Sequence, residues 1–143
     1  MINFSTITKA VEELLTNNLP GYVITRNEEI NSDPNVATRY KGWVGVYRGS
    51  LEYEAYTVGA GRRWMTNLEI LIVLQAASLQ NGAEAEDRLQ DAEKEIMDVL
   101  TANPTLSGSV AMTTGYSIEY EYKREQQVYF HAAIITIKGQ VRA

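Results

Sequence analysis

This sequence of 143 residues contains one histidine and no cysteine, so few side chains could perform imidazole or thiol chemistry. The absence of cysteine excludes cysteine-bound zinc, iron–sulfur clusters, thiol catalysis and a disulfide scaffold. His131 follows Phe130 in a β-prone run, and a catalytic triad or a metal site would need orienting partners or further ligands. We therefore interpret His131 as a structural histidine.

Two pairs of glutamates are spaced so that each pair shares one face of an extended strand, Glu119 with Glu121 and Glu52 with Glu54. Paired carboxylates can act as acid and base, but only in a cleft that shifts the pKa of one of them. The glutamates of the first pair alternate with aromatic and aliphatic residues, namely Tyr116, Ile118, Tyr120 and Tyr122. This alternation favours a solvated or interfacial face, and the sequence contains no complete catalytic constellation.

The segment VGAGRR at positions 58–63 places two glycines beside two arginines, a combination that could hold a phosphate with backbone amides. It completes neither GxxxxGK[ST] nor GxGxxG, and no predicted strand leads from it directly into a helix. The segment NSD at 31–33 lacks the glycine and the terminal glutamate of a calcium loop. We therefore predict neither a cofactor nor a metal, and we interpret the arginines as contacts for a partner's carboxylates.

Aromatic residues are the unusual feature of the chain, with nine tyrosines and two tryptophans. Many of them lie in residues 43–64 and 116–122, and together with arginine these residue types dominate protein interfaces. The candidate partner-binding residues are Tyr53, Tyr56, Arg62, Arg63 and Trp64. The alternative is a tyrosine-rich edge of the core.

Composition indicates one ordinary domain, with 45% hydrophobic and 22% charged residues. The net charge of −5 and the pI of about 4.9 have the wrong sign for binding DNA phosphates over a broad surface. The N-terminal residues show no secretory signal, and the longest apolar stretch, 68–77, is too short for a membrane helix. We therefore expect a cytoplasmic protein without a membrane partner.

Two segments have the periodicity of amphipathic helices. The first covers residues 4–17 and stops at Leu19-Pro20-Gly21. The second begins at Asn81, where Glu84 three residues later resembles a capping box, and ends near residue 103. At about 20 residues, roughly 30 Å, it is long enough to cross a small sheet.

Five segments have the character of β-strands: residues 22–25, 43–47, 68–77, 116–122 and 128–141. The third is almost continuously apolar, which predicts a central strand covered on much of both faces. The last two are joined by a turn at 123–126, too short for a crossover, and therefore predict an antiparallel hairpin.

The connections complete the predicted fold. Residues 27–35, rich in Asn, Glu, Asp and Pro, predict an exposed turn or loop, and residues 48–66, which lack a regular apolar face, predict a long protruding loop or hairpin. The fold class is therefore α+β, with a single mainly antiparallel sheet and two helices packed on one face. We expect residues 1–143 to form a single domain.

The motifs follow one another in a distinctive order. The strand WVGVY at 43–47 is followed by GAGRRW at 59–64, LEILIVLQ at 68–75, EDRL at 86–89 in an Ala/Glu-rich helix, and NPTLSGSV at 103–110 before the closing hairpin. This order resembles the tail terminator, or tail completion, proteins of tailed bacteriophages. The resemblance covers nearly the whole chain and rests on patterns rather than on a catalytic signature.

The resemblance implies a virion protein of the tail and neck, assembled in the host cytoplasm as a hexameric ring at the head-proximal end of the tail tube. Such a ring ends tail polymerisation and offers a surface for head attachment, and it implies no catalytic residues. The implied partners are copies of the same chain, the tail tube protein, the head–tail connector and neck proteins, and the sheath of a sheathed tail. DNA would pass through the lumen without specific binding, which an acidic lumen favours.

Three alternatives stay open. The first is another neck component, such as a head-closure or connector protein. The second is an enzyme or small-ligand domain that uses Glu119 and Glu121 in a deep pocket. The third is a regulatory or adaptor dimer, whose two-fold stoichiometry would differ from that of a six-fold ring.

Overall fold

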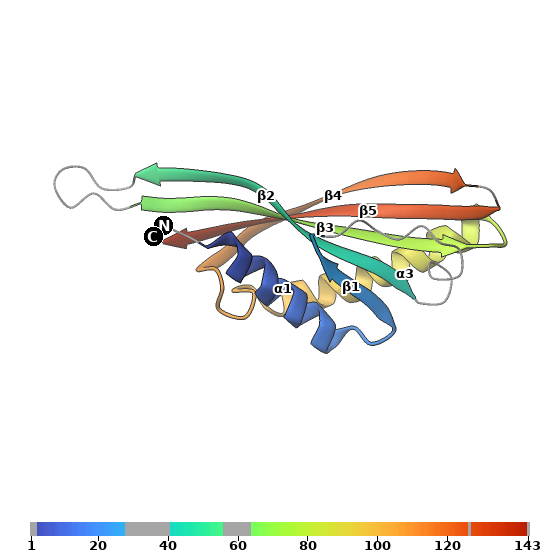
Figure 1. The fold of residues 1–143 in the computed structure, drawn as a ribbon, viewed down its shortest axis with the longest axis horizontal. Coiled ribbons are helices and arrows are strands. Elements are labelled where there is room, and N and C mark those ends of the chain that lie inside the picture. The colour runs from blue at the N-terminus through green and yellow to red at the C-terminus, as the bar shows by residue number, and fades with distance from the viewer. Residues whose placement is uncertain (1–2, 28–40, 56–63, 126, 143) are drawn as a thin grey trace.

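The computed structural model describes residues 3–27, 41–55, 64–125 and 127–142. In chain order its elements are α1 (Phe4–Asn18), β1 (Tyr22–Arg26), β2 (Gly42–Ala55), β3 (Trp64–Ser78), α3 (Gly82–Thr101), β4 (Met112–Glu125) and β5 (Val128–Arg142). The strands form one sheet in the order β1-β2-β3-β5-β4 (Figure 1). β1 pairs with β2 in parallel, and the other neighbouring strands are antiparallel.

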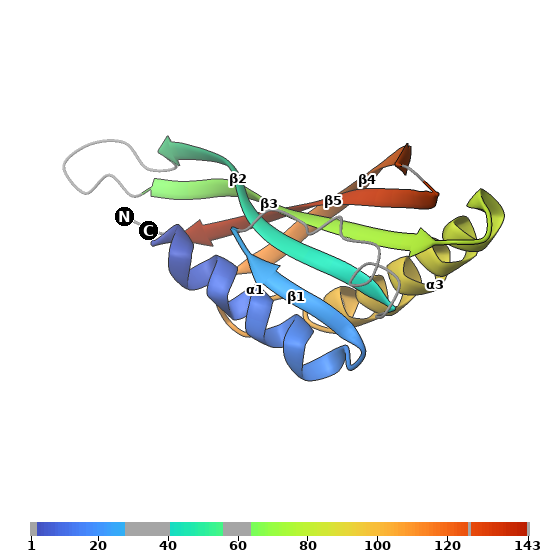
Figure 2. The same ribbon diagram turned by 45° about the vertical axis from the view of Figure 1, so that its right-hand side comes forward.

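Both helices lie on the same face of the sheet (Figures 1 and 2). α1 contacts β1 and β2, whereas α3 contacts chiefly β3 and β5. This arrangement confirms the predicted α+β class, with a mainly antiparallel sheet and two helices on one face. Neither of the described helices is long and apolar enough to cross a membrane.

Asparagine side chains cap the N-termini of both helices. Asn3 Oδ1 accepts a hydrogen bond from the Ser5 amide at 3.1 Å, and Asn81 Oδ1 accepts one from the Glu84 amide at 2.8 Å. Each cap satisfies one backbone N–H of a first turn that has no partner inside the helix. The predicted cap at Asn81 is confirmed, but the Glu84 carboxylate forms an ion pair with Arg88 at 3.4 Å instead of completing the capping box.

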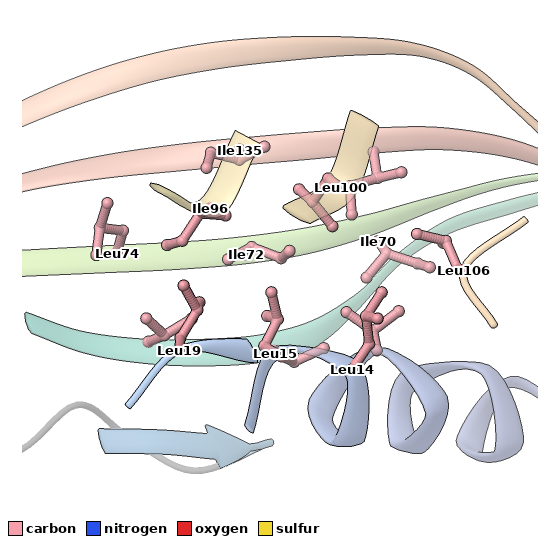
Figure 3. Close-up of a cluster of buried hydrophobic side chains, with 14 of the residues drawn as sticks. Leu14, Leu15, Leu19, Ile70, Ile72, Leu74, Ile96, Leu100, Leu106 and Ile135 are labelled. Atoms are coloured by element: carbon pink, nitrogen blue, oxygen red, sulfur yellow. The ribbon is translucent and has the colours of Figure 1, made fainter. Parts of the chain in front are cut away.

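The core lies between the two helices and the sheet (Figure 3). Its helix residues follow the predicted periodicity: Phe4, Ile7, Val11, Leu14 and Leu15 of α1, and Ala85, Leu89, Ala92, Ile96 and Leu100 of α3. Because both helices place one apolar stripe against the same sheet face, a single core serves the whole domain.

β3 is the central strand of the sheet, as predicted. Its helix-facing side chains are at most 2% exposed: Leu68, Ile70, Ile72 and Leu74. Alternation along the strand directs Leu71 and Val73 to the opposite face, where they are half-buried. Among the described residues, helices therefore cover β3 on one face, and the predicted cover on both faces is confirmed only in part.

The strands extend beyond the hydrophobic runs that predicted them. β2 and β3 pair as far as Ala55 opposite Trp64, so the described part of segment 48–66 is a hairpin. β4 pairs with β5 as far as Glu125, which shortens the turn predicted at 123–126. Ladder hydrogen bonds join backbone groups and do not require apolar side chains, so polar residues can extend both pairs. Residues 28–35 of the predicted loop lie outside the described residues.

Candidate assembly surfaces

The β2–β3 hairpin extends past the end of α1 at one end of the molecule (Figure 1). The exposed carboxylates of Glu52 and Glu54 lie along it, two residues apart on one face as predicted. Asn67 Nδ2 of β3 donates a hydrogen bond to Glu54 Oε2 at 3.3 Å across the two strands. The hairpin is therefore a polar projection whose backbone is held by strand pairing.

Two of the five predicted partner-binding residues fall within the described part of this hairpin. Tyr53 lies on β2 and is half-buried, and Trp64 begins β3. Tyr56, Arg62 and Arg63 lie outside the described residues. The structure thus places Tyr53 and Trp64 on one hairpin, and the role of all five candidates in binding stays a prediction.

A β-bulge interrupts β2 where the hairpin leaves the helix-covered part of the sheet. The pairing register of β2 with β3 shifts between Arg48 and Leu51, and Gly49 lies within the shift. A Cβ atom at Gly49 would lie 2.6 Å from the carbonyl oxygen of Glu69 on β3. Bulges bend a strand and increase its twist, so this glycine permits the close approach that directs the hairpin.

The sheet face opposite the helices carries apolar side chains on three adjacent strands. We call this surface the open face and define it by Trp43, Tyr47, Leu71, Val73 and Ile134, all half-buried. Tyr47 of β2 pairs with Leu71 of β3, and Val73 of β3 pairs with Ile134 of β5 on the opposite edge of that strand. Within the described residues, both helices contact the sheet from the other face.

A groove of about 540 Å³ lies between α3 and β4. We call it the α3–β4 groove, and its lining residues are Glu86, Gln90, Glu93, Lys94, Met97, Tyr120 and Tyr122. The two tyrosine residues are 46% and 61% exposed, respectively. Because they alternate with Glu119 and Glu121, their side chains share the helix-facing side of β4.

Hydrogen bonds and ring contacts hold the aromatic side of this groove. The Tyr120 hydroxyl donates to Glu93 Oε1 at 2.7 Å. His131 Nδ1 and Glu86 Oε2 are hydrogen-bonded at 2.7 Å, and the Tyr122 ring meets the His131 ring edge-on at a centroid distance of 4.4 Å. These contacts support the structural role predicted for His131, because they join it to both walls of the groove.

The same contacts shift two ionisation equilibria. The hydrogen bond to Glu93 raises the pKa of Tyr120 to about 12, because it stabilises the neutral phenol as a donor. The hydrogen bond from His131, with a second one from Gln90, lowers the pKa of the Glu86 carboxyl, because both favour its ionised form. At neutral pH the groove therefore presents the ionised carboxylate of Glu86 and the neutral phenol of Tyr120.

Replacing Glu86 with glutamine is expected to lower stability at pH 7 by about 1 kcal/mol, the range of a partly exposed hydrogen bond to a charged group. Because folding lowers the pKa of Glu86, its ionised form adds stability above the ordinary carboxyl value, and this is lost as pH falls through the lowered value. Urea denaturation from pH 7 to pH 2 should show the two proteins converging at the acid end. A difference that stays constant to pH 2 would refute a contribution from Glu86 ionisation.

The paired glutamates predicted on β4 share one face, as expected. Glu119 and Glu121 pair with Ile134 and Ala132 of β5, on the side of the sheet away from the helices. Both glutamates are exposed, which agrees with a solvated face. Within the described ranges, no group of three histidine, aspartate or glutamate residues could hold a metal ion.

Sequence reasoning missed the α3–β4 groove. Its two pairs join residues far apart in the chain, Glu86 with His131 and Glu93 with Tyr120. One signal was present, because Glu86, Gln90 and Glu93 recur at a spacing that puts them on one face of a helix. Only the packing of α3 against β5 and β4 shows which strand residues this face meets.

No family model matches the chain, and no curated protein matches it. Among solved structures, the chain is similar to a chain of the structure described as "Virion of native gene transfer agent (GTA) particle". The alignment has a TM-score of 0.43 and 10% sequence identity, and it covers 95% of this chain and 94% of that chain. A likeness of this degree supports no conclusion about function.

Proposed function

We propose that this protein is a structural subunit of a phage-like virion that assembles into a hexameric ring. The ring caps the head-proximal end of a tail tube, ends tail polymerisation and provides the surface for head attachment. Its partners are copies of itself, the tail tube protein, neck proteins and, in a sheathed tail, the sheath. In this role the protein is not an enzyme, and DNA passes through the ring without specific binding.

The open face is the observation that carries this proposal. Half-buried aromatic and aliphatic side chains extend over three adjacent strands on the face of the sheet opposite α1 and α3. Such a surface gains free energy when another protein removes it from water. The order of sequence motifs from WVGVY at 43–47 to NPTLSGSV at 103–110 supports a tail terminator as the type of assembly. The net charge of −5 suits a lumen through which DNA slides.

Native mass and particle shape test the proposal. Light scattering over a concentration series, followed by negative-stain images with and without added tail tubes, should show a six-fold ring with a central hole. A two-fold dimer at every concentration, or a monomer that tail tubes do not assemble, would contradict the ring. Copurification with the portal complex instead of tail tube protein would assign the chain to the head side of the joint.

The double substitution Val73→Thr with Ile134→Thr is expected to weaken assembly roughly tenfold or more, because each change puts a hydroxyl in the apolar open face. Threonine keeps the branched shape that suits a strand, so the subunit should stay folded. Circular dichroism checks the fold, and sedimentation measures assembly.

Val141→Thr is the matched control, because Val141 is a half-buried strand residue that packs against the core on the helix side. This variant should assemble like the wild type. Assembly weakened equally by the control and the double variant would show that lost stability, rather than the open face, is responsible.

A further inference from the structure

Two chemically different surfaces lie at opposite ends of the domain. The hairpin occupies the end of β3 that begins at Trp64, whereas Tyr122 of the α3–β4 groove aligns through His131 with Ala76 near the other end. About twelve residues of β3 separate Trp64 from Ala76, roughly 40 Å at the rise of a strand. In Figure 2 the paired ends of β2 and β3 lie at one end of the molecule and the start of α3 lies at the other.

The groove has the chemistry of a guanidinium site. The exposed ring of Tyr122 and the ring of Tyr120 provide aromatic surface, and Glu86 and Glu93 provide carboxylates. Each of these carboxylates has acceptor positions left after its intramolecular hydrogen bonds, because a carboxylate can accept about four. Arginine is the side chain that stacks on aromatic rings and also forms paired hydrogen bonds with carboxylates.

The matching arginines directly precede β3 in the sequence. Residues 56–63 have the sequence YTVGAGRR, which contains two arginines and no acidic residue. Arg62 and Arg63 directly precede Trp64, so their backbone stays within roughly 7 Å of the start of β3. They therefore cannot reach the groove of their own chain, about 40 Å away, but they can reach the groove of a neighbouring copy.

We infer that Arg62 and Arg63 of one subunit bind in the α3–β4 groove of the next subunit, between its exposed tyrosines and the carboxylates of Glu86 and Glu93. This inference rests on the proposed function, for which it names the head-to-tail contact. A closed ring of identical subunits requires two unlike complementary surfaces on each chain. The hairpin and the groove provide both, and Lys94 in the groove limits how strongly the contact attracts arginine.

Charge reversal on each side tests the contact. Arg62→Glu with Arg63→Glu should leave the subunit folded and reduce ring formation roughly tenfold or more, because like charges then face each other. Glu86→Arg with Glu93→Arg should do the same from the groove side. The variant that combines all four substitutions should recover ring formation, because opposite charges meet again. The control is Asp87→Arg with Asp91→Arg, two exposed residues of α3 outside the groove lining, which should assemble normally.

A direct binding measurement separates this inference from the proposed function. A synthetic peptide of residues 54–66 is titrated into the full-length Arg62→Glu, Arg63→Glu variant and followed by amide NMR shifts. Shifts confined to α3 and β4 are expected, and the same peptide with both arginines changed to glutamate should bind roughly tenfold more weakly. Tyr122→Leu should also weaken binding, through loss of the aromatic face.

The outcomes fall into distinct groups. The inference is overturned if the Glu86→Arg, Glu93→Arg variant forms the ring as the wild type does, or if the peptide causes no shifts in α3 and β4. Either result leaves the proposed function standing. A wild-type protein that never forms a ring overturns the proposed function, and the peptide titration then decides the head-to-tail contact by itself. Loss in each one-sided variant, with recovery in the combined variant, supports both.

Discussion

Replacing Ile72 with alanine is expected to lower the free energy of unfolding by about 3–4 kcal/mol. Ile72 is fully buried at the centre of β3, and Figure 3 shows it between Leu15 of α1 and Ile96 of α3. Alanine would leave a cavity bounded by both helices and the sheet, which are fixed by their other contacts and cannot collapse into it. Urea denaturation at one low protein concentration measures the change without a contribution from assembly.

Two further variants calibrate this result. Ile72→Val removes one methylene and should cost about 1 kcal/mol. Leu71→Ala changes the adjacent residue of β3, which is half-buried on the open face, and should cost about half as much as Ile72→Ala. Equal losses at positions 71 and 72 would show that the two faces of β3 are equally packed, contrary to the structure.

Replacing Gly49 with alanine is expected to destabilise the protein by about 1–3 kcal/mol and to impair assembly at the same time. The new Cβ would lie 2.6 Å from the carbonyl oxygen and 3.0 Å from the carbonyl carbon of Glu69, so backbone must move to relieve the clash. The bulge lies at the start of the hairpin, and its distortion would redirect the part of β2 that follows it. Thermal unfolding and native mass measure the two effects.

Gly115→Ala is the control for this prediction, because Gly115 also lies at a bulge, in β4, but a Cβ there would have no heavy atom within 4 Å. This variant should unfold within about 0.5 kcal/mol of the wild type and assemble normally. If both variants behave alike, the sensitivity belongs to bulges in general, and the close approach of Gly49 to Glu69 has no special effect.

Local patterns predicted the helices and the centre of the sheet. The stripe from Phe4 to Leu15 and the stripe from Ala85 to Leu100 are buried as expected. The apolar run at 68–77 is the core of the central strand. Such patterns are readable because one face of each element must leave water, and that requirement repeats along the sequence with the period of the element.

Strand ends and strand order were harder to predict. The residues from Glu52 to Ala55 lack an apolar run and belong to β2 because β3 lies beside them. β1 pairs in parallel with β2, although nothing in its five residues indicates the direction of pairing. Both features depend on backbone hydrogen bonds between segments, which any side chain permits. The bulge at Gly49 also depends on a contact between segments, because the backbone at Gly49 approaches the carbonyl group of Glu69 on the neighbouring strand.

The sequence by itself determined the helix periods, the cap at Asn81 and the lack of cysteine chemistry, because these follow from residue type and local spacing. Only the tertiary structure decided that Glu86 meets His131, that α1 and α3 both pack on the face opposite the open face, and that the hairpin and the α3–β4 groove lie at opposite ends. These relations join residues tens of positions apart. They are set by the packing of α3 across the sheet, which buries the apolar stripe of the helix and brings distant polar residues together as a consequence.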